Sequence, residues 1–484
     1  MKHQQRQHLC TVLFLAYMTV AVVRSMALPN TAATKANKVI LHWFRHGDLR
    51  LHDNPALVFS SQESSSSSCF VLPVFCYDSN IFGTTARTPT GSLKCGPRRA
   101  QFVRESVIDL RNSLRQRLGS ELLVMHGEPV TALSTLLEKF KETQVDIVMQ
   151  EEVLKEERDT VRAMKRLLQQ HGRGKLHTIW GSTMYERMDL PYANDLSDMP
   201  DVFTPFRNKV EKKSKIRNPL SSPTKLDFPA NDTAEYRSIT EMIAFSPTLH
   251  DLGYTVEEMS EELKADARGV MQFRGGETAA LQRVKEYIWD KDLLKDYFDT
   301  RNGMIGADYS TKLSPWLAHG CVSPRFVAAE CKRYEETRVA NKSTYWVVFE
   351  LLWRDFCKFF ADKHGDTVFF PGGTVGSDKT WPHYEENFEA WKNGKTGYPL
   401  VDANMREIVA TGFMSNRGRQ NVASFLALDC NNDWRAGGDW FETHLLDYDV
   451  YSNWIVSTHL PRKISAVDPN HPFSRGRTGA LRQG

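Results

Sequence analysis

The feature that most constrains the fold is an alternation of short apolar runs with amphipathic segments between residues 38 and 181. The segments between the runs, such as 102–118 and 153–168, repeat their apolar residues with a helical period. Strands that alternate with helices predict a parallel, doubly wound sheet. No Gly-x-Gly-x-x-Gly motif follows the first run, so the sheet is not a standard dinucleotide binder. The predicted strands are 39–44, 70–77, 121–126, 146–149 and 176–180.

The remainder of the chain divides into a connector and a helical region. Residues 182–249 are rich in Pro, Ser and charge and show no sustained period, which is typical of a connector. From Gly276 onward the pattern is helical with frequent aromatic residues, and we place an all-helical domain at 250–454. The fold class is therefore an α/β amino-terminal domain plus a large all-helical domain. Basic residues of the connector indicate a solvated face; they are Lys209, Lys212, Lys213, Lys215 and Arg217.

Both ends of the chain are expected to lie outside the fold. Lys2 and Arg6 precede an apolar run at 9–23, so residues 1–37 resemble a targeting leader or a disordered segment. The run is short for a membrane span, and we expect no stable membrane association. Residues 455–484 carry little apolar content and are expected to be disordered.

The eight cysteines bear on the compartment. They form no Cys-x-x-Cys pair and no metal-ligand spacing, which predicts reduced, mostly buried thiols and no metal site. This pattern fits secretion poorly and favours an organelle, a plastid before a mitochondrion. If the natural chain starts later than Met1, the protein is expected in the cytoplasm or nucleus instead.

A cluster of hydroxyls with one lysine indicates an anion site at 310–315. Ser314 followed by Pro315 predicts a helix start, with Ser at the N-cap and Pro at the first helical position. Ser310, Thr311 and Lys312 precede that start, where the positive end of a helix suits phosphate. The alternative is capping alone, which is also our interpretation of the later Ser323-Pro324-Arg325.

The segment 345–360 predicts a helix that carries polar residues beside its core stripe. Glu350 and Arg354 lie at i,i+4, and an ion pair on the helix surface is the simpler interpretation. Trp353 shares the face of Glu350, so the two side chains could instead line a pocket for a nucleobase.

A second polar cluster follows later in the chain. In an extended stretch Asp447 and Asp449 point the same way, and with Arg419 they could form a buried charge network around a polar ligand. Separate structural ion pairs are the alternative.

Taken in order and spacing, these stretches resemble the photolyase/cryptochrome family. Residues 43–57 resemble its amino-terminal signature, and segments 180–207 and 297–304 resemble the DASH type. The resemblance runs from about residue 38 to 454, most of the chain. The stretches that resemble signatures of the family's FAD domain are TKLSPWLAHGCVSPR, ELLWRDF, WKNGKTGYPLVDANMRE and SNRGRQNVASFLALD.

The resemblance implies an α/β domain joined to a helical domain that binds FAD. Asn453 would face the flavin N5 atom. The cofactor-binding residues would be Tyr297 and Arg301 at the entrance, Ser310, Thr311, Leu313 and Ser314 at the pyrophosphate, and Arg354, Asn416, Arg419, Asp447 and Asp449 at the flavin and ribose.

The implied activity is light-driven repair of cyclobutane pyrimidine dimers in DNA. Glu350, Trp353 and Gln420 would contact the dimer, Trp353 by stacking on it. The dimer must leave the base stack, which is easiest from a single strand. The expected partner is therefore single-stranded DNA, bound by a monomer, although a net charge of +3 alone would not indicate nucleic acid. The alternative is a blue-light sensor without repair turnover.

Two accessory features are also implied. Many DASH members carry an antenna folate, 5,10-methenyltetrahydrofolate, and Glu152 is our candidate contact for it. Family members reduce the flavin through a chain of tryptophans, in which Trp381 and Trp434 match the outer and middle members.

The sequence departs from the family pattern at two places. Residues 45–48 contain one residue more than the usual spacing, in a loop after the first strand where an insertion costs little. After Trp454 the innermost tryptophan would fall at Ser457, and the residue that helps to cover the substrate would fall at His459. A splice or frame error in the gene model is one interpretation of this departure. If the tail is genuine, these replacements predict weaker FAD retention and a broken tryptophan chain.

Overall fold

The computed structural model describes residues 38–455, except 66–68, 141, 173, 232 and 379. The predicted leader, the predicted tail beyond Ile455 and the departures at Ser457 and His459 lie outside the described residues.

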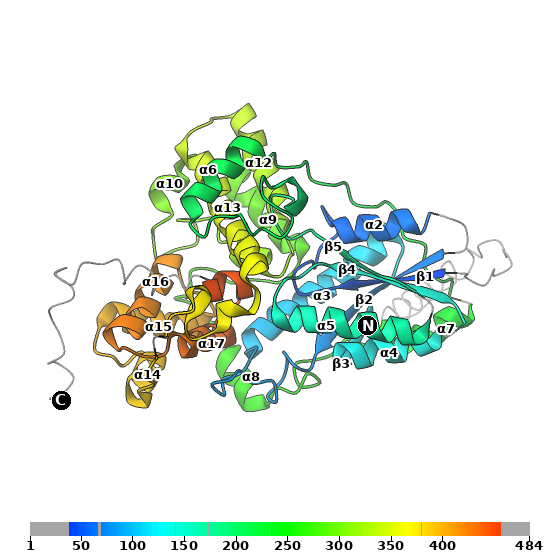
Figure 1. Cartoon of the computed structure of the whole chain (residues 1–484), viewed down its shortest axis with the longest axis horizontal. Helices are drawn as coiled ribbons and strands as arrows, with labels where there is room; N and C mark the ends of the chain where they lie inside the picture. Colours follow the sequence, from blue (N-terminus) through cyan, green and yellow to red (C-terminus); the bar gives the residue numbers. More distant parts are fainter. Residues whose placement is uncertain are drawn as a thin grey trace, which may run out of the picture. The chain divides into compact units, whose positions relative to one another are not determined.

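The five predicted strands form one parallel sheet in the order β3-β2-β1-β4-β5 (Figure 1). The order reverses at β1, which pairs with β2 on one side and with β4 on the other, so the sheet is doubly wound as predicted. The strands are β1 (Lys38–Phe44), β2 (Cys69–Asp78), β3 (Leu123–Gly127), β4 (Gln144–Gln150) and β5 (Leu176–Ile179).

Both faces of the sheet are covered, which explains why its strands read as continuous apolar runs. Successive side chains of β1 alternate between the faces: Ile40 and Phe44 belong to one buried cluster, whereas Leu41 and Trp43 belong to another. The first cluster includes α2 (Pro55–Glu63) and α3 (Pro97–Leu118), and the second includes α4 (Pro129–Lys139), α5 (Lys155–His171) and α7 (Ala234–Ala244).

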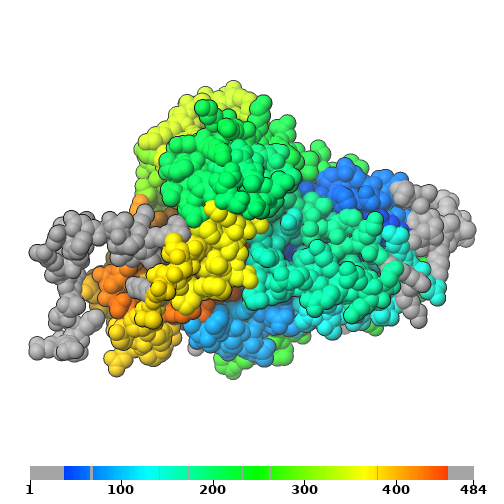
Figure 2. All heavy atoms as spheres, in the orientation of Figure 1, coloured from blue at the N-terminus to red at the C-terminus, as the bar shows by residue number. Residues whose placement is uncertain are grey.

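The stretch 182–249 is more structured than its composition predicts. It contains α7, which buries Ile239 and Ile243 in the second cluster, and α6 (Phe203–Lys213), which buries Phe206 and Val210. The apolar residues of both helices are buried by contacts with other elements, and the local sequence pattern did not predict these helices. In Figure 2 this green segment lies against the yellow end of α13 (Lys342–His364), where Asp201 forms ion pairs with α13.

Most basic residues of this stretch face solvent, as predicted: Lys212, Lys213, Lys215 and Arg217 are exposed, and Lys209 is half-buried. Lys209 lies 3.6 Å from an Asp198 carboxylate oxygen, and the exposed Arg217 lies 2.6 Å from one of Asp189.

Every regular element described after β5 is helical, which confirms the predicted helical domain. The first buried cluster continues from the sheet into these helices, so the two parts share one core. The longer helices beyond α7 and α13 are α8 (Val256–Glu262), α9 (Glu277–Lys285), α12 (Pro324–Thr337), α14 (Glu385–Lys392), α15 (Pro399–Thr411), α16 (Asn416–Ser424) and α17 (Trp434–His444), and the short ones are α10 (Tyr297–Thr300) and α11 (Ser314–Ala318).

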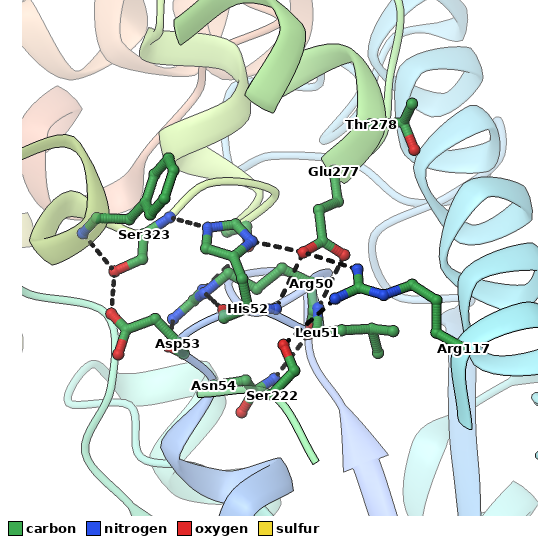
Figure 3. A network of polar contacts seen from close by, with 12 residues as sticks. Arg50, Leu51, His52, Asp53, Asn54, Arg117, Ser222, Glu277, Thr278 and Ser323 are labelled. Atoms are coloured by element: carbon green, nitrogen blue, oxygen red, sulfur yellow. Dashed lines mark hydrogen bonds and ion pairs between the residues drawn. The ribbon is translucent and has the colours of Figure 1, made fainter. Parts of the chain in front are cut away.

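Buried charges join the turn after β1 to the helical part (Figure 3). The Arg50 guanidinium donates to four backbone carbonyl oxygens, including Gly181 O and Gly320 O at 3.0 Å. Glu277 at the start of α9 accepts from the backbone N–H groups of Leu51 and His52 at 3.0 and 2.9 Å. A close approach of backbones accompanies these bonds, because a Cβ at Gly320 (φ +64°) would lie 1.9 Å from Gly47 O.

We call residues 50–54 with Glu277, Ser323 and Arg325 the interdomain clamp. An ion pair between Arg325 and Asp53 lies at its centre. Arg325 donates to Asp53 at 2.6 and 3.0 Å, and the two side chains are 5% and 1% exposed. Ser323 caps α12 by accepting from two backbone N–H groups, as predicted, and its hydroxyl also donates to Asp53. The clamp thus holds the start of α12 against the sheet.

The seven cysteines within the described ranges are buried free thiols, as predicted. No described helix combines the length and apolar composition that a bilayer crossing requires.

Candidate functional site

Helix α13 presents three predicted site residues on one face. Asn341 caps its first turn by accepting hydrogen bonds from two backbone N–H groups. Glu350, Trp353 and Arg354 follow at i, i+3 and i+4, which places them side by side on the helix surface.

Glu350 contacts an arginine of another segment. Its Oε1 atom accepts from Arg301 Nη1 at 2.9 Å and from Trp346 Nε1 at 3.0 Å. Burial raises the pKa of the Glu350 carboxyl group, and Arg301 and Trp346 oppose that rise. The predicted i,i+4 ion pair with Arg354 is therefore wrong, because each member takes a partner distant in sequence.

Trp353 is 38% exposed, and one face of its indole is already covered. The ring of Phe203, at the start of α6, stacks on it with centroids 3.7 Å apart and planes 13° apart. Phe356 packs edge-on at 5.8 Å. Phe203 was missed by the sequence analysis, which left its segment as a connector, although it lies in the stretch that resembles the DASH type.

Two arginine–aspartate pairs lie at the position of the predicted charge network. Arg419 Nη2 donates to both Asp447 oxygens at 2.7 and 2.8 Å, and Asp447 is almost fully buried. Arg354 Nε lies 3.3 Å from Asp449 Oδ2. The two aspartates thus pair with different arginines, from α16 and α13, and the single network centred on Arg419 is replaced by two separate pairs.

Buried polar atoms in this region have unused hydrogen-bonding capacity. Arg301 Nε, Tyr309 Oη and Asn404 Oδ1 are buried without a partner among the described residues. Buried polar groups are normally paired, so a donor and an acceptor left open point to a polar ligand. A dinucleotide such as FAD, which carries both donors and acceptors, fits this set.

The loop 310–314 differs from its predicted form. Ser314 is the first residue of α11 instead of its cap; Leu313 takes the cap position with a helical backbone and makes no side-chain cap bond. The helix has only five residues, so the predicted dipole contribution to anion binding is small. Arg283, which was not predicted, shapes the loop by donating to Thr311 O at 3.0 Å and Ser310 O at 3.3 Å.

Lys312 is buried within this loop. Its Nζ lies over the ring of Tyr309 and 3.3 Å from the Ser310 hydroxyl. Burial, with a smaller contribution from Arg283, lowers the pKa of Lys312 to about 7. An anion bound by the loop would restore the charged form.

The remaining cofactor and substrate candidates lie around these groups. Tyr297 is buried at the start of α10, and Asn416 is exposed at the start of α16. Gln420 accepts from Arg417 at 3.2 Å, and Arg417 also donates to Asn302 Oδ1 at 3.0 Å. Gln420 is thus linked through Arg417 to Asn302, the residue after Arg301 in the chain.

The tryptophans form a cluster of their own. Trp434 and Trp454 have ring centroids 5.8 Å apart, and Trp381 packs against them as a partly buried member. Trp454 was not predicted as a member of this cluster. The side chain of Asn453, the residue before it, donates to Gly438 O at 3.2 Å.

Glu152 lies at the point where the sheet order reverses. It accepts from Gln150 at 2.6 Å and Lys358 at 2.9 Å, and Tyr451 also donates to it. Burial would raise the pKa of Glu152, but Lys358 and these hydrogen bonds hold it below its usual value. A cavity of about 240 Å³ lies beside it, lined in part by Arg158, Arg162 and Lys165.

Comparisons with known proteins agree with this arrangement. Residues 40–226 match the family described as DNA photolyase, and residues 346–465 match the FAD binding domain of DNA photolyase. The chain is 48% identical to "Cryptochrome DASH, chloroplastic/mitochondrial" of Ostreococcus tauri over 86% of this chain and 77% of that protein, and 46% identical to the protein of the same name in Arabidopsis thaliana over 88% and 71%. The solved Synechocystis cryptochrome superposes with a TM-score of 0.77 at 42% identity, covering 88% of this chain and 83% of that one.

Proposed function

This chain belongs to the DASH group of the photolyase/cryptochrome family and is a blue-light FAD flavoprotein, and on that premise we propose that it repairs cyclobutane pyrimidine dimers in single-stranded DNA. The observation that carries the proposal is the half-exposed Trp353 beside the Glu350–Arg301 pair. An aromatic face next to hydrogen-bonding groups is what a splayed-out base requires.

Each side chain has a distinct task in this proposal. Bound FAD supplies light absorption and one-electron donation. Trp353 stacks on the dimer with the face that Phe203 leaves open, and Glu350 bonds the pyrimidine edge while Arg301 fixes its orientation. Gln420 contributes a further amide contact. The cofactor is held by two arginine–aspartate pairs and by residues around them. These residues are Arg354, Arg419, Asp447 and Asp449, with the loop 310–314, Tyr297, Asn416 and Asn453.

The test is dimer loss from an irradiated oligothymidine under blue light. Trp353→Ala should weaken binding of the dimer-containing strand by about 1–3 kcal/mol, roughly 5- to 150-fold. The matched control is Tyr384→Ala, which removes an aromatic ring that is 50% exposed and is not among the predicted substrate contacts. Flavin-loaded protein that absorbs light but leaves dimers intact would instead support the sensor alternative.

We also propose that the cavity beside Glu152 takes the antenna folate. Arg158, Arg162 and Lys165 in its lining suit the carboxylates of a folate, and they share the cavity with Glu151, Asp362 and Glu152, which is already engaged by Lys358. Arg162→Gln should lower the affinity for methenyltetrahydrofolate in a fluorescence titration. Equal affinities of the variant and the wild type would reject this site.

We propose that the protein is imported into an organelle, because the plant and algal relatives carry the words chloroplastic/mitochondrial in their names. Fusion of residues 1–37 to a fluorescent protein tests this and separates plastid from mitochondrion. A diffuse cytoplasmic signal would contradict it.

A further inference from the structure

A tyrosine lies between a tryptophan and a carboxylate just after α17. The Tyr448 hydroxyl donates to Glu442 Oε2 at 2.9 Å and accepts from Trp454 Nε1 at 3.1 Å. Trp454 in turn packs on Trp434 at 5.8 Å. The tryptophan cluster is therefore connected through one phenol to one carboxylate.

Burial raises the pKa of the neutral Tyr448 phenol well above its usual value, so the phenol keeps its proton until the ring is oxidised. The Arg99 guanidinium lies 4.7 Å from the centre of the Tyr448 ring, so a positive charge left on that ring would be repelled. A phenol that loses an electron becomes a very strong acid, and it needs a base already in hydrogen-bond contact. Glu442 is the group in that position.

Glu442 has the basicity that the task requires. Burial raises the pKa of its carboxyl group to about 7; Arg99, Lys94 and the Tyr448 hydrogen bond oppose the rise, and Asp439 adds to it. A carboxylate with a near-neutral pKa is a better proton acceptor than an ordinary one, yet it remains ionised above neutrality.

We propose that Tyr448 and Glu442 form a redox relay that removes an oxidising equivalent from Trp454. One electron passes from Tyr448 to the one-electron-oxidised indole of Trp454, which returns to its neutral form. The phenolic proton moves from Tyr448 Oη to Glu442 Oε2, leaving a neutral phenoxyl radical and a carboxylic acid. The charges balance: before the step the indole is positive and the carboxylate negative, and after it the indole, the phenoxyl radical and the carboxylic acid are all neutral.

The relay rests on the flavoprotein assignment only for its oxidant, photoexcited oxidised flavin, which takes up the electron and is thereby reduced to the form that the proposed repair uses. Its consequence is a longer-lived charge separation, because return of the electron to Tyr448 must be coupled to return of the proton from Glu442.

The relay can be tested without light or flavin. Azide radicals generated by pulse radiolysis oxidise tryptophan in the full chain, and transient absorption follows indolyl decay and phenoxyl formation. We expect Tyr448→Phe to remove part of the phenoxyl signal. Glu442→Gln should remove the same part, since an amide keeps the hydrogen-bond acceptor but is a far weaker base. The matched control is Tyr254→Phe, a buried tyrosine whose hydroxyl donates to a backbone carbonyl.

The pH profile separates the relay from a structural role. Ionisation of Glu442 falls about tenfold between pH 8 and pH 6 if its pKa is about 7, so the Tyr448-dependent rate should fall about tenfold as well. The proposal would be overturned if Tyr448→Phe gave the same phenoxyl signal as the wild type, or if the rate of phenoxyl formation did not change between pH 8 and pH 6. If Tyr448→Phe fails to fold, Trp454→Phe replaces it: this variant should lose the same part of the phenoxyl signal, and an unchanged signal would overturn the proposal. Failure of DNA repair would leave these readouts unaffected.

Discussion

Replacing Asp53 by Asn tests whether the interdomain clamp stabilises the fold through its buried charge. The Asp53 side chain is 1% exposed and receives bonds from Arg325, Ser323 and the backbone N–H of Leu220. Asn keeps the size and one oxygen atom but removes the negative charge. The Arg325 guanidinium, 5% exposed, would then lose its counter-charge.

The expected cost follows from that burial. Breaking a buried ion pair by removing one member costs about 3–5 kcal/mol, because the other charge stays in the interior unpaired. This is a large share of the roughly 5–15 kcal/mol that separates folded from unfolded states of a typical domain. Replacing Asp53 and Arg325 together by Leu and Met removes both charges, so the double variant should recover most of the loss.

Urea unfolding followed by circular dichroism measures the effect. The control is Glu336→Gln, which breaks the surface pair between Glu336 and Lys332 and should leave the unfolding midpoint unchanged. The reasoning would be refuted if Asp53→Asn unfolded at the midpoint of this control, or if the double variant were less stable than Asp53→Asn alone.

Three further predictions concern single side chains. Phe203→Leu should weaken binding of oligothymidine, measured by fluorescence anisotropy, by removing a stack on Trp353 worth about 0.5–1.5 kcal/mol; Phe206→Leu should not, and equal losses would contradict the prediction. Lys312→Met should stabilise the flavin-free protein against heat. The folded-state pKa of Lys312 is lowered to about 7, so the gain should be greatest below pH 7 and shrink as pH rises toward 10.5; a pH-independent gain would be evidence against it. Gly320→Ala should destabilise in urea more than Gly376→Ala, which has the same φ of +64° but open space around it, and equal losses would exclude the close approach as the cause.

Local signals in the sequence determined the secondary structure of the sheet and the start of α12. All five strands lie where the apolar runs predict them, because strands of a sheet covered on both faces are predominantly apolar. Ser323-Pro324 caps α12 as predicted, since a cap depends on only a few consecutive residues. Long motifs in order and spacing likewise identified the family and its FAD domain.

Tertiary structure decided which side chains are partners. Glu350 pairs with Arg301 and Arg354 with Asp449, although i,i+4 spacing favours a pair within α13. An exposed i,i+4 pair gains only about 0.3–0.5 kcal/mol, so contacts brought by other segments prevail easily.

The same reason explains what sequence reasoning missed. Ser314 does not cap α11, because Lys312 adopts a left-handed backbone (φ 58°) and Leu313 takes the cap position in a helical conformation. The stacking of Phe203 on Trp353 joins residues that are distant in the chain, and no local pattern encodes it. The sequence by itself thus determined the elements and the family, whereas only packing between distant segments determined the geometry of the site.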